Sequence, residues 1–337
     1  MRIISYSLAV VGVVAAGALL ALSFTPKDTS FLSLQDTDSI FARYVAREGK
    51  SYGTKEEYEF RKDQYFRNMA AYNDALEVGA TFTLGENKFS DWTPQEYRRL
   101  LGYKKVEITE DESEVLQAVE GLEAPTSIDW RSSGAVTPVK DQASCGSCWA
   151  FSTTGALEGA HFVATKKLVS LSEQQFVDCS KKNAGCNGGD MYAAMVYAKT
   201  NPVELESAYP YTGRDGTCKF DKTKGVVTAT SAARVQANSV AALKAAIAIS
   251  PVSVSIEADT RVFQGYTGGI LNSAKCGTNL DHGVLAVGYG TENGQDFYIV
   301  KNSWGPNWGE KGYIRIAAVN GSGICGIQMD SSQPKTN

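Results

Sequence analysis

The chain is organised around the stretch Gln142-Ala143-Ser144-Cys145-Gly146-Ser147-Cys148-Trp149-Ala150-Phe151-Ser152, which holds two cysteines three residues apart. Apolar residues follow at helical spacing, at Leu157, Ala160 and Ala164, so we expect a helix that begins near Cys148. The free N–H groups and the dipole of a helix N-terminus favour negative charge. Because the thiolate is the nucleophilic form of cysteine, this position predicts a reactive Cys148.

A pair of cysteines at this spacing also suits a zinc site or a disulfide. Zinc is disfavoured because the chain has only two histidines and no second Cys-x2-Cys pair to complete the ligand set. None of the seven cysteines precedes Cys145. An odd number in an exported protein leaves one thiol unpaired once the others form disulfides.

Length and charge narrow the class of protein. The 337 residues carry a formal net charge of −4, and they are enough for one large hydrophobic core or two smaller ones. Because the chain is mildly acidic and has no lysine- or arginine-rich run, we expect no nucleic-acid partner.

The N-terminus predicts export. Arg2 precedes an uncharged run from Ile3 to Phe24 that ends in small residues around Ser23. We therefore expect a signal peptide over residues 1–23 and no stable membrane span. An uncleaved anchor is the alternative, because the run is long enough to cross a bilayer. Both routes lead to the oxidising secretory pathway, and from there to a lysosome, a vacuole or the extracellular space.

Residues 24–123 differ in composition from the rest of the chain, since they lack cysteine and carry many charges. Thr54 and Glu57 form a helix-capping pattern, and Tyr65 belongs to an apolar stripe that needs a core to pack against. Residues 104–123 are rich in glutamate and lack aromatic residues. They predict a solvated linker that proteases can cut.

The composition changes near Ala124. Helical patterns dominate the first half of residues 124–337, and short strands separated by glycine turns dominate the second half. This order predicts an α+β fold, with a helical subdomain over about residues 124–235 and an antiparallel barrel-like subdomain over about residues 236–325.

Only two histidines are available as a general base. His161 lies along the predicted helix, about 20 Å from Cys148, so we expect it to be structural. His282 directly precedes the strand-like run 284–287, and Asn302 follows another strand, where its amide can orient the imidazole. A thiol, an imidazole and an orienting group form the arrangement of acyl transfer.

These motifs resemble those of papain-family cysteine protease precursors, and most closely the cathepsin L-like branch. Cys145-Gly146-Ser147-Cys148-Trp149 matches the family's sequence around its nucleophile, with His282 and Asn302 at the family's distance downstream. The resemblance covers nearly all of the chain after about residue 35. It implies a papain-like two-domain fold with the active site in the cleft, preceded by a helical inhibitory propeptide over residues 24–123.

The resemblance implies a role for each matching residue. Cys148 is the nucleophile, His282 the general acid and base, and Asn302 the residue that orients His282. Gln142 forms the oxyanion hole with the Cys148 N–H. Trp304 shields the bond between His282 and Asn302. The implied disulfides are Cys145–Cys186, Cys179–Cys218 and Cys276–Cys325, which leave Cys148 free. The implied substrate-binding residues are Gly188, Gly189, Asp190, Met191, Ser255, Leu280, Asp281, Gly283, Trp304 and Asp330.

The propeptide signature of the family is matched with a few departures. Tyr65 replaces the usual Phe or Trp, and Tyr72 replaces an Ile, so the apolar stripe is kept. Leu76 replaces an Asn, which removes one polar contact. The matching residues are Glu57, Arg61, Asn68, Gly85, Asn87, Phe89 and Asp91. We expect this segment to pack against the catalytic unit and to fill its cleft.

The implied function is that of a cysteine endopeptidase made as an inactive secreted or lysosomal zymogen. It acts on polypeptides through a Cys148 thioester, is inhibited by its own propeptide, needs no cofactor or metal and is monomeric when mature. Endopeptidase action is favoured because the chain lacks the spare histidines and the propeptide cysteine with which exopeptidase relatives restrict the cleft. An inactive homologue and a peptide ligase are the rival functions.

Asp330 is a departure at the floor of the pocket for the second residue before the cut. An acid there predicts tolerance of basic as well as apolar side chains, unless the Asp330 carboxylate faces solvent. We also expect acidification to weaken the ion pairs of the propeptide and to start activation.

Overall fold

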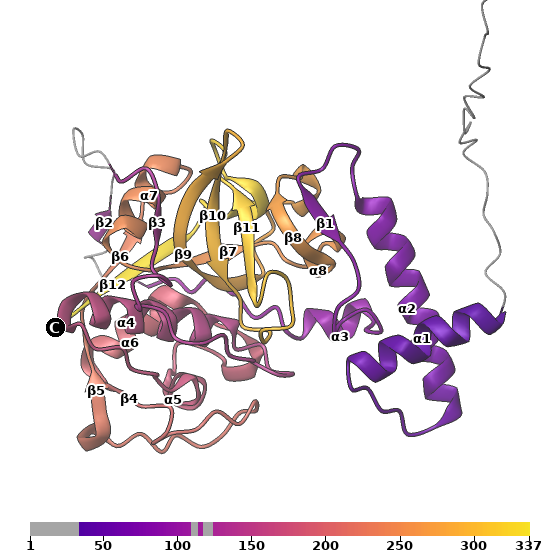
Figure 1. The fold of residues 1–337 in the computed structure, drawn as a ribbon. Helices are drawn as coiled ribbons and strands as arrows, with labels where there is room; N and C mark the ends of the chain where they lie inside the picture. The colour runs from indigo at the N-terminus through magenta and orange to yellow at the C-terminus, as the bar shows by residue number, and fades with distance from the viewer. Residues whose placement is uncertain (1–33, 109–113, 117–123) are drawn as a thin grey trace, which may run out of the picture.

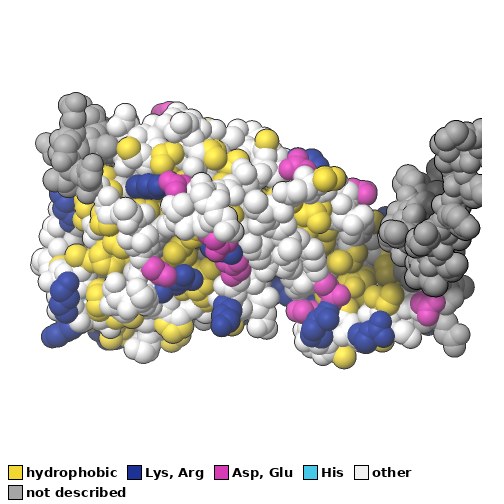
Figure 2. All heavy atoms as spheres, turned by 45° about the horizontal axis from the view of Figure 1, so that its top comes forward, with side chains coloured by type: hydrophobic (Ala, Val, Ile, Leu, Met, Phe, Trp, Pro, Cys, Tyr) yellow, Lys and Arg dark blue, Asp and Glu magenta, His cyan; other side chains and the backbone are white. Residues whose placement is uncertain are grey.

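The computed structural model describes residues 34–108, 114–116 and 124–337. The predicted signal peptide and most of the acidic linker lie outside these residues. Within the described part, no helix is both long enough and apolar enough to cross a membrane. On the face drawn in Figure 2, basic and acidic side chains are interspersed, in keeping with the small net charge of the chain.

The N-terminal segment (residues 34–108) forms a helical arm at one side of the molecule, on the right in Figure 1. Its elements are α1 (Leu34–Arg47), α2 (Lys55–Ala75), β1 (Phe82–Leu84) and α3 (Pro94–Arg98). The Thr54 side chain accepts from the Glu57 N–H, as the capping pattern predicts, but the Glu57 carboxylate accepts from the N–H of Gly53 rather than of Thr54. The Thr54 side chain therefore caps the first turn of α2, and the Glu57 side chain holds the backbone just before it.

The apolar stripe of α2 packs in two directions. Tyr65 forms a small buried cluster with Phe41 and Tyr44 of α1, whereas Tyr72 lies against the backbone of Gly265 in the C-terminal unit (residues 124–337). Further along the segment, buried aromatic and aliphatic side chains join the large core of the C-terminal unit. The arm thus has a minor core of its own and depends on the C-terminal unit for the rest, as we expected.

The helical layer of the C-terminal unit lies below the sheet in Figure 1. Its helices are α4 (Cys148–Thr165), α5 (Glu173–Cys179) and α6 (Met191–Thr200). They are followed by β4 (Val203–Glu204) and β5 (Gly225–Val227), which pair with each other in antiparallel fashion. Most of α4 is buried, because Gly155 and Gly159 let Leu285 and Pro251 approach its backbone closely. Ser172 caps α5 by accepting from the Gln175 N–H.

A mostly antiparallel sheet runs in the order β1-β8-β11-β10-β9-β7-β12-β6-β2, with β3 paired to β9. Its strands are β2 (Glu114–Leu116), β3 (Ile128–Asp129), β6 (Ala229–Val235), β7 (Val252–Ile256), β8 (Tyr266–Leu271), β9 (His282–Glu292), β10 (Gln295–Lys301), β11 (Tyr313–Ala317) and β12 (Ser331–Thr336). The remaining elements of the C-terminal unit are α7 (Val240–Ile249), α8 (Arg261–Gln264), η1 (Gly185–Asn187), η2 (Lys222–Lys224), η3 (Ala274–Cys276) and η4 (Ile324–Gly326). The α+β fold is confirmed.

The sheet differs from a simple antiparallel barrel in two respects. Its path has two ends in the described chain, and the pairs β8–β11 and β2–β6 are parallel. Both end strands, β1 and β2, come before residue 124 in the chain. Each extends the sheet of the C-terminal unit, because β1 pairs with β8 and β2 pairs with β6. The predicted solvated linker is therefore wrong at residues 114–116, which pair with β6 because that strand offers a free edge.

The cysteines pair as the resemblance implied. Disulfides join Cys145 to Cys186, Cys179 to Cys218 and Cys276 to Cys325, and Cys148 is free and buried. Because Cys145 is in a disulfide, the two cysteines of the central stretch do not form a zinc pair.

Candidate active site

Cys148 is the first residue of α4, and its side chain is fully buried. The preceding Ser147 makes no side-chain cap, so the first N–H groups of the helix are not satisfied by it. The sulfur accepts from the N–H of Gly283 at 3.4 Å and from the N–H of Gly102 at 3.3 Å. One donor belongs to the C-terminal unit and the other to the N-terminal segment. The thiol therefore lies where the two parts of the chain meet.

His282 is the first residue of β9, and its side chain is also fully buried. Its Nε2 lies 2.9 Å from Oδ1 of Asn302, and its ring stacks on Trp304 at a centroid distance of 4.7 Å. Nδ1 has no hydrogen-bond partner among the described residues. The neighbouring residue Gly283 donates to the Cys148 sulfur. The tertiary structure thus brings the predicted thiol, imidazole and amide to one place.

Burial favours the neutral form of both side chains in this state. It raises the pKa of the Cys148 thiol to about 11, although the backbone N–H groups of Gly283, Gly102 and Trp149 favour the thiolate. It lowers the pKa of His282 to about 4, although the hydrogen bond to Asn302 favours the charged ring. The thiolate expected from the helix N-terminus is therefore not the stable form here, because the cover over the sulfur removes water from it.

Gln142 is fully buried, and both polar groups of its side chain are engaged. Its Oε1 accepts from Ser303 Oγ at 2.7 Å and from Trp304 Nε1 at 3.1 Å. Its Nε2 donates to the carbonyl of Cys145 and to that of Leu100, both at 2.8 Å. Leu100 belongs to the N-terminal segment, so the predicted oxyanion donor already holds a peptide carbonyl.

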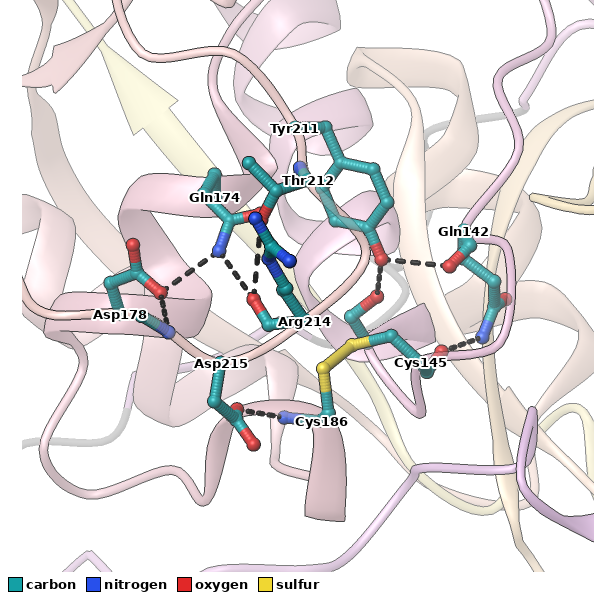
Figure 3. Close-up of a disulfide and its surroundings, with 12 residues drawn as sticks. Gln142, Cys145, Gln174, Asp178, Cys186, Tyr211, Thr212, Arg214 and Asp215 are labelled. Atoms are coloured by element: carbon teal, nitrogen blue, oxygen red, sulfur yellow. Dashed lines mark hydrogen bonds between the residues drawn. A yellow bond between two sulfur atoms is a disulfide. The ribbon is translucent and has the colours of Figure 1, made fainter.

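The loop that carries Gln142 is tied to the helical layer, as Figure 3 shows. The Tyr211 hydroxyl donates to the Gln142 carbonyl at 2.8 Å and shares a 2.6 Å hydrogen bond with Ser147. The disulfide Cys145–Cys186 lies next to these bonds and joins the loop to η1. These contacts hold the loop that carries Gln142 in position.

The N-terminal segment continues through the predicted substrate cleft. The Gly189 N–H donates to the Gly102 carbonyl at 2.8 Å, and the Lys104 N–H donates to the Gly189 carbonyl at 2.9 Å, which makes a parallel bridge. On the other side, the Tyr103 N–H donates to the Asp281 carbonyl at 2.9 Å. The segment is thus held on both walls of the cleft by backbone hydrogen bonds.

The Tyr103 side chain fills the predicted pocket for the second substrate residue. It is buried, it belongs to the same apolar cluster as Met191 and Leu280, and its hydroxyl donates to Asp330 Oδ2 at 2.8 Å. With the N-terminal segment in place, the Asp330 side chain is 11% exposed, and its carboxylate faces Tyr103 and Arg234 rather than solvent. An acid therefore lies at the end of the space that the Tyr103 side chain occupies.

The remaining predicted pocket residues have structural tasks as well. Asp190 caps α6 through the N–H groups of Tyr192 and Ala193, and its second oxygen accepts from the Val106 N–H at 3.0 Å. Ser255 is buried on β7. Gly283 is required at its position because a β-carbon there would press against Met191 and the Trp149 backbone.

A network of buried charges behind Asn302 was missed by the sequence analysis. Lys140 Nζ lies 2.7 Å from Glu173 and 3.5 Å from Glu158, and the neighbouring Lys301 Nζ donates to the Thr137 carbonyl at 2.8 Å. Burial lowers the pKa of Lys301 to about 8. No local pattern marks these residues, because the partners come from distant parts of the chain.

The N-terminal segment is braced by the residues of its signature. Arg61 makes two 2.7 Å hydrogen bonds to Glu96, and the Asn68 amide donates to the carbonyls of Ser90 and Trp92. Asp91 is buried and accepts from Tyr44, Tyr52 and Lys50. Phe89 packs edge-on against Trp304, at a centroid distance of 5.2 Å. The brace is therefore continuous with the indole that stacks on the histidine.

Known proteins share both parts of this architecture. Residues 124–335 match a family model described as papain family cysteine protease, and residues 41–97 match one described as cathepsin propeptide inhibitor domain. The chain is 44% identical to germination-specific cysteine protease 1 of Arabidopsis thaliana, over 92% of this chain and 87% of that protein. It is 43% identical to digestive cysteine proteinase 1 of Homarus americanus, over 90% of this chain and 96% of that protein. The structure is similar to that of digestive procathepsin L 3 of Tenebrio molitor, with a TM-score of 0.80, 36% identity and coverage of 89% of this chain and 99% of that one.

Proposed function

Because this chain belongs to the papain family of cysteine proteases, we propose that it cleaves peptide bonds through a thioester on Cys148. The Cys148 thiolate, formed by proton transfer to His282, attacks the substrate carbonyl carbon. The Gln142 amide and the Cys148 backbone N–H donate to the resulting oxyanion. His282 then protonates the leaving amine, and water that has given a proton to His282 releases the acid product and the thiol.

The bond of 2.9 Å between His282 Nε2 and Asn302 Oδ1, next to the one free thiol of the chain, carries this assignment. An amide oxygen at Nε2 requires a proton there, which leaves Nδ1 of the neutral ring to accept the proton of Cys148. Stacking on Trp304 keeps water from this bond. The arrangement supports a nucleophile, a base and an orienting group in these three residues.

The chain is a cysteine endopeptidase made as a zymogen, and its propeptide is an intramolecular inhibitor. We infer that the propeptide inhibits by engaging the groups that the reaction needs. The Leu100 carbonyl uses the Gln142 amide, and the Gly102 N–H covers the sulfur of Cys148. Acidification then starts activation by protonating carboxylates and so weakening the ion pairs that hold the propeptide.

We further propose the organisation and location of the protein. The signal peptide spans residues 1–23, the propeptide residues 24–123 and the catalytic domain residues 124–337, which is a monomer when mature. The secretory pathway delivers it to a lysosome, a vacuole or the extracellular space. The substrate-binding residues are those that the family resemblance implied. The pocket at Asp330 takes apolar and aromatic side chains, in keeping with its occupation by Tyr103.

Replacing the proposed reacting groups tests this function. We expect Cys148→Ser and His282→Ala to abolish cleavage of a fluorogenic dipeptide amide and labelling by an epoxide inhibitor. His161→Ala is the matched control, because His161 lies thirteen residues along α4 from Cys148, so it should cleave at the wild-type rate. An active Cys148→Ser protein would overturn the assignment.

A further inference from the structure

The carboxylate of Asp330 already has a cationic partner within the catalytic domain. Arg234 of β6 donates from Nη1 to Asp330 Oδ1 at 2.8 Å. Its Nη2 lies 3.9 Å from Asp190, and its guanidinium lies over the Tyr192 ring at 4.4 Å from the centroid. The Arg234 side chain is 22% exposed. Because three neighbours hold it, the guanidinium is a fixed part of the pocket.

The two oxygens of Asp330 face different partners. Oδ1 faces Arg234, whereas Oδ2 accepts from the Tyr103 hydroxyl at 2.8 Å and lies 3.0 Å from Lys105 Nζ. Tyr103 and Lys105 belong to the propeptide and leave with it, while Arg234 stays. The mature pocket therefore presents one oxygen of a carboxylate whose other oxygen is paired with Arg234. Asp190, 3.9 Å from the same guanidinium, is engaged by the N–H groups at the start of α6.

A basic side chain gains little from such a carboxylate. A lysine or arginine that enters the buried pocket meets Arg234 as well as Asp330, so repulsion offsets much of the attraction. Lys105 does not contradict this, because its side chain is 63% exposed and approaches from the rim, where water screens the charge. A neutral hydroxyl that donates to Oδ2 meets no such repulsion, as Tyr103 illustrates.

We propose that Arg234 is a specificity-determining residue, which makes the pocket for the second substrate residue select tyrosine and disfavour arginine and lysine. The inference rests on the proposed function and deepens it. It also revises the expectation that Asp330 confers tolerance of basic side chains, because the charge on which that expectation relied is taken up by Arg234.

The test uses the mature enzyme, processed from the full chain, and four peptide amides that differ only in the second residue before the cut: tyrosine, phenylalanine, leucine or arginine. For the wild type we expect kcat/KM about tenfold higher for tyrosine than for phenylalanine, and lowest for arginine. Arg234→Gln should raise kcat/KM for the arginine peptide relative to the leucine peptide by about 10- to 100-fold. The double variant Arg234→Gln/Asp330→Asn should lose this gain.

Two further variants complete the design. Arg131→Gln removes an arginine from another ion pair, with Asp129, outside the cleft, and should leave kcat/KM for all four peptides unchanged. Asp330→Asn alone should bring the ratio of tyrosine to phenylalanine close to one, and it tests the proposal if Arg234→Gln does not fold. An unchanged ratio of arginine to leucine in folded Arg234→Gln, or efficient cleavage of the arginine peptide by the wild type, would overturn the proposal. Absence of cleavage of every peptide, with no epoxide labelling, would instead count against the proposed function.

Discussion

Gly102 of the propeptide provides a sharp test of how the zymogen is kept inactive. A β-carbon at this position would overlap the backbone carbonyl of Gly146, and no flexible side chain is there to move away. Gly102→Ala must therefore shift the propeptide where it crosses the thiol. The shift breaks the hydrogen bonds from Gly102 to the Cys148 sulfur, from Gly189 to Gly102 and from Tyr103 to Asp281.

The expected increase in exposure of the Cys148 thiol follows from the loss of these three hydrogen bonds. At about 1 kcal/mol each, their loss weakens closure of the cleft by about 3 kcal/mol, which corresponds to roughly 100-fold more exposed thiol. Exposure also returns water to the sulfur, which reverses the rise in the pKa of Cys148 caused by burial. We therefore expect the full-length Gly102→Ala zymogen to react roughly 100-fold faster with iodoacetamide at neutral pH than the wild type does.

The assay is intact-mass measurement of the unprocessed zymogen over time, since Cys148 is the one cysteine outside a disulfide. Gly53→Ala is the matched control, because the nearest atom to a β-carbon there is a flexible Glu57 oxygen at 3.8 Å. It should react at the wild-type rate. Equal alkylation rates for folded Gly102→Ala and wild-type zymogen would show that Gly102 does not shield the sulfur.

Three other predictions concern the brace of the propeptide and the orienting amide. Hydrogen bonding from Arg61 lowers the pKa of Glu96 from 4.5 to about 2. This ion pair therefore stabilises the zymogen above pH 4.5, and its contribution is lost as the pH falls towards 2. Glu96→Gln should flatten the fall in melting temperature between these pH values, and an unaltered fall would exclude the pair as its cause. Asp91→Ala leaves two tyrosine hydroxyls without their carboxylate acceptor and Lys50 without its ion-pair partner, which should cost about 3 kcal/mol of zymogen stability in urea unfolding. An unchanged midpoint would contradict this. Asn302→Ala should lower kcat about 100-fold with little change in KM, because the His282 ring loses its orienting acceptor, and an unchanged kcat would refute that role.

Local patterns predicted the features that depend on near neighbours. The helix that begins at Cys148, the cap of α2 by Thr54 and the strand that includes residues 284–287 all lie where the sequence placed them. The position of His282 and Asn302 relative to the thiol came from the family resemblance, since no local rule relates residues so far apart. The buried lysines and glutamates behind Asn302 had no signal at all, because charged residues are ordinarily exposed.

The sequence by itself determined which residues are candidates for the chemistry and which helices and strands present them, because hydrophobic period, caps and turns act over a few residues. Only the tertiary structure decided how those residues are held in the zymogen. It placed Leu100 on Gln142 and Gly102 over the sulfur, and it joined Arg234 to Asp330. The protonation of Cys148 depends on this cover, because desolvation outweighs the helix N-terminus once water is excluded. Burial and long-range pairing are properties of the packed chain, and no short stretch of it specifies them.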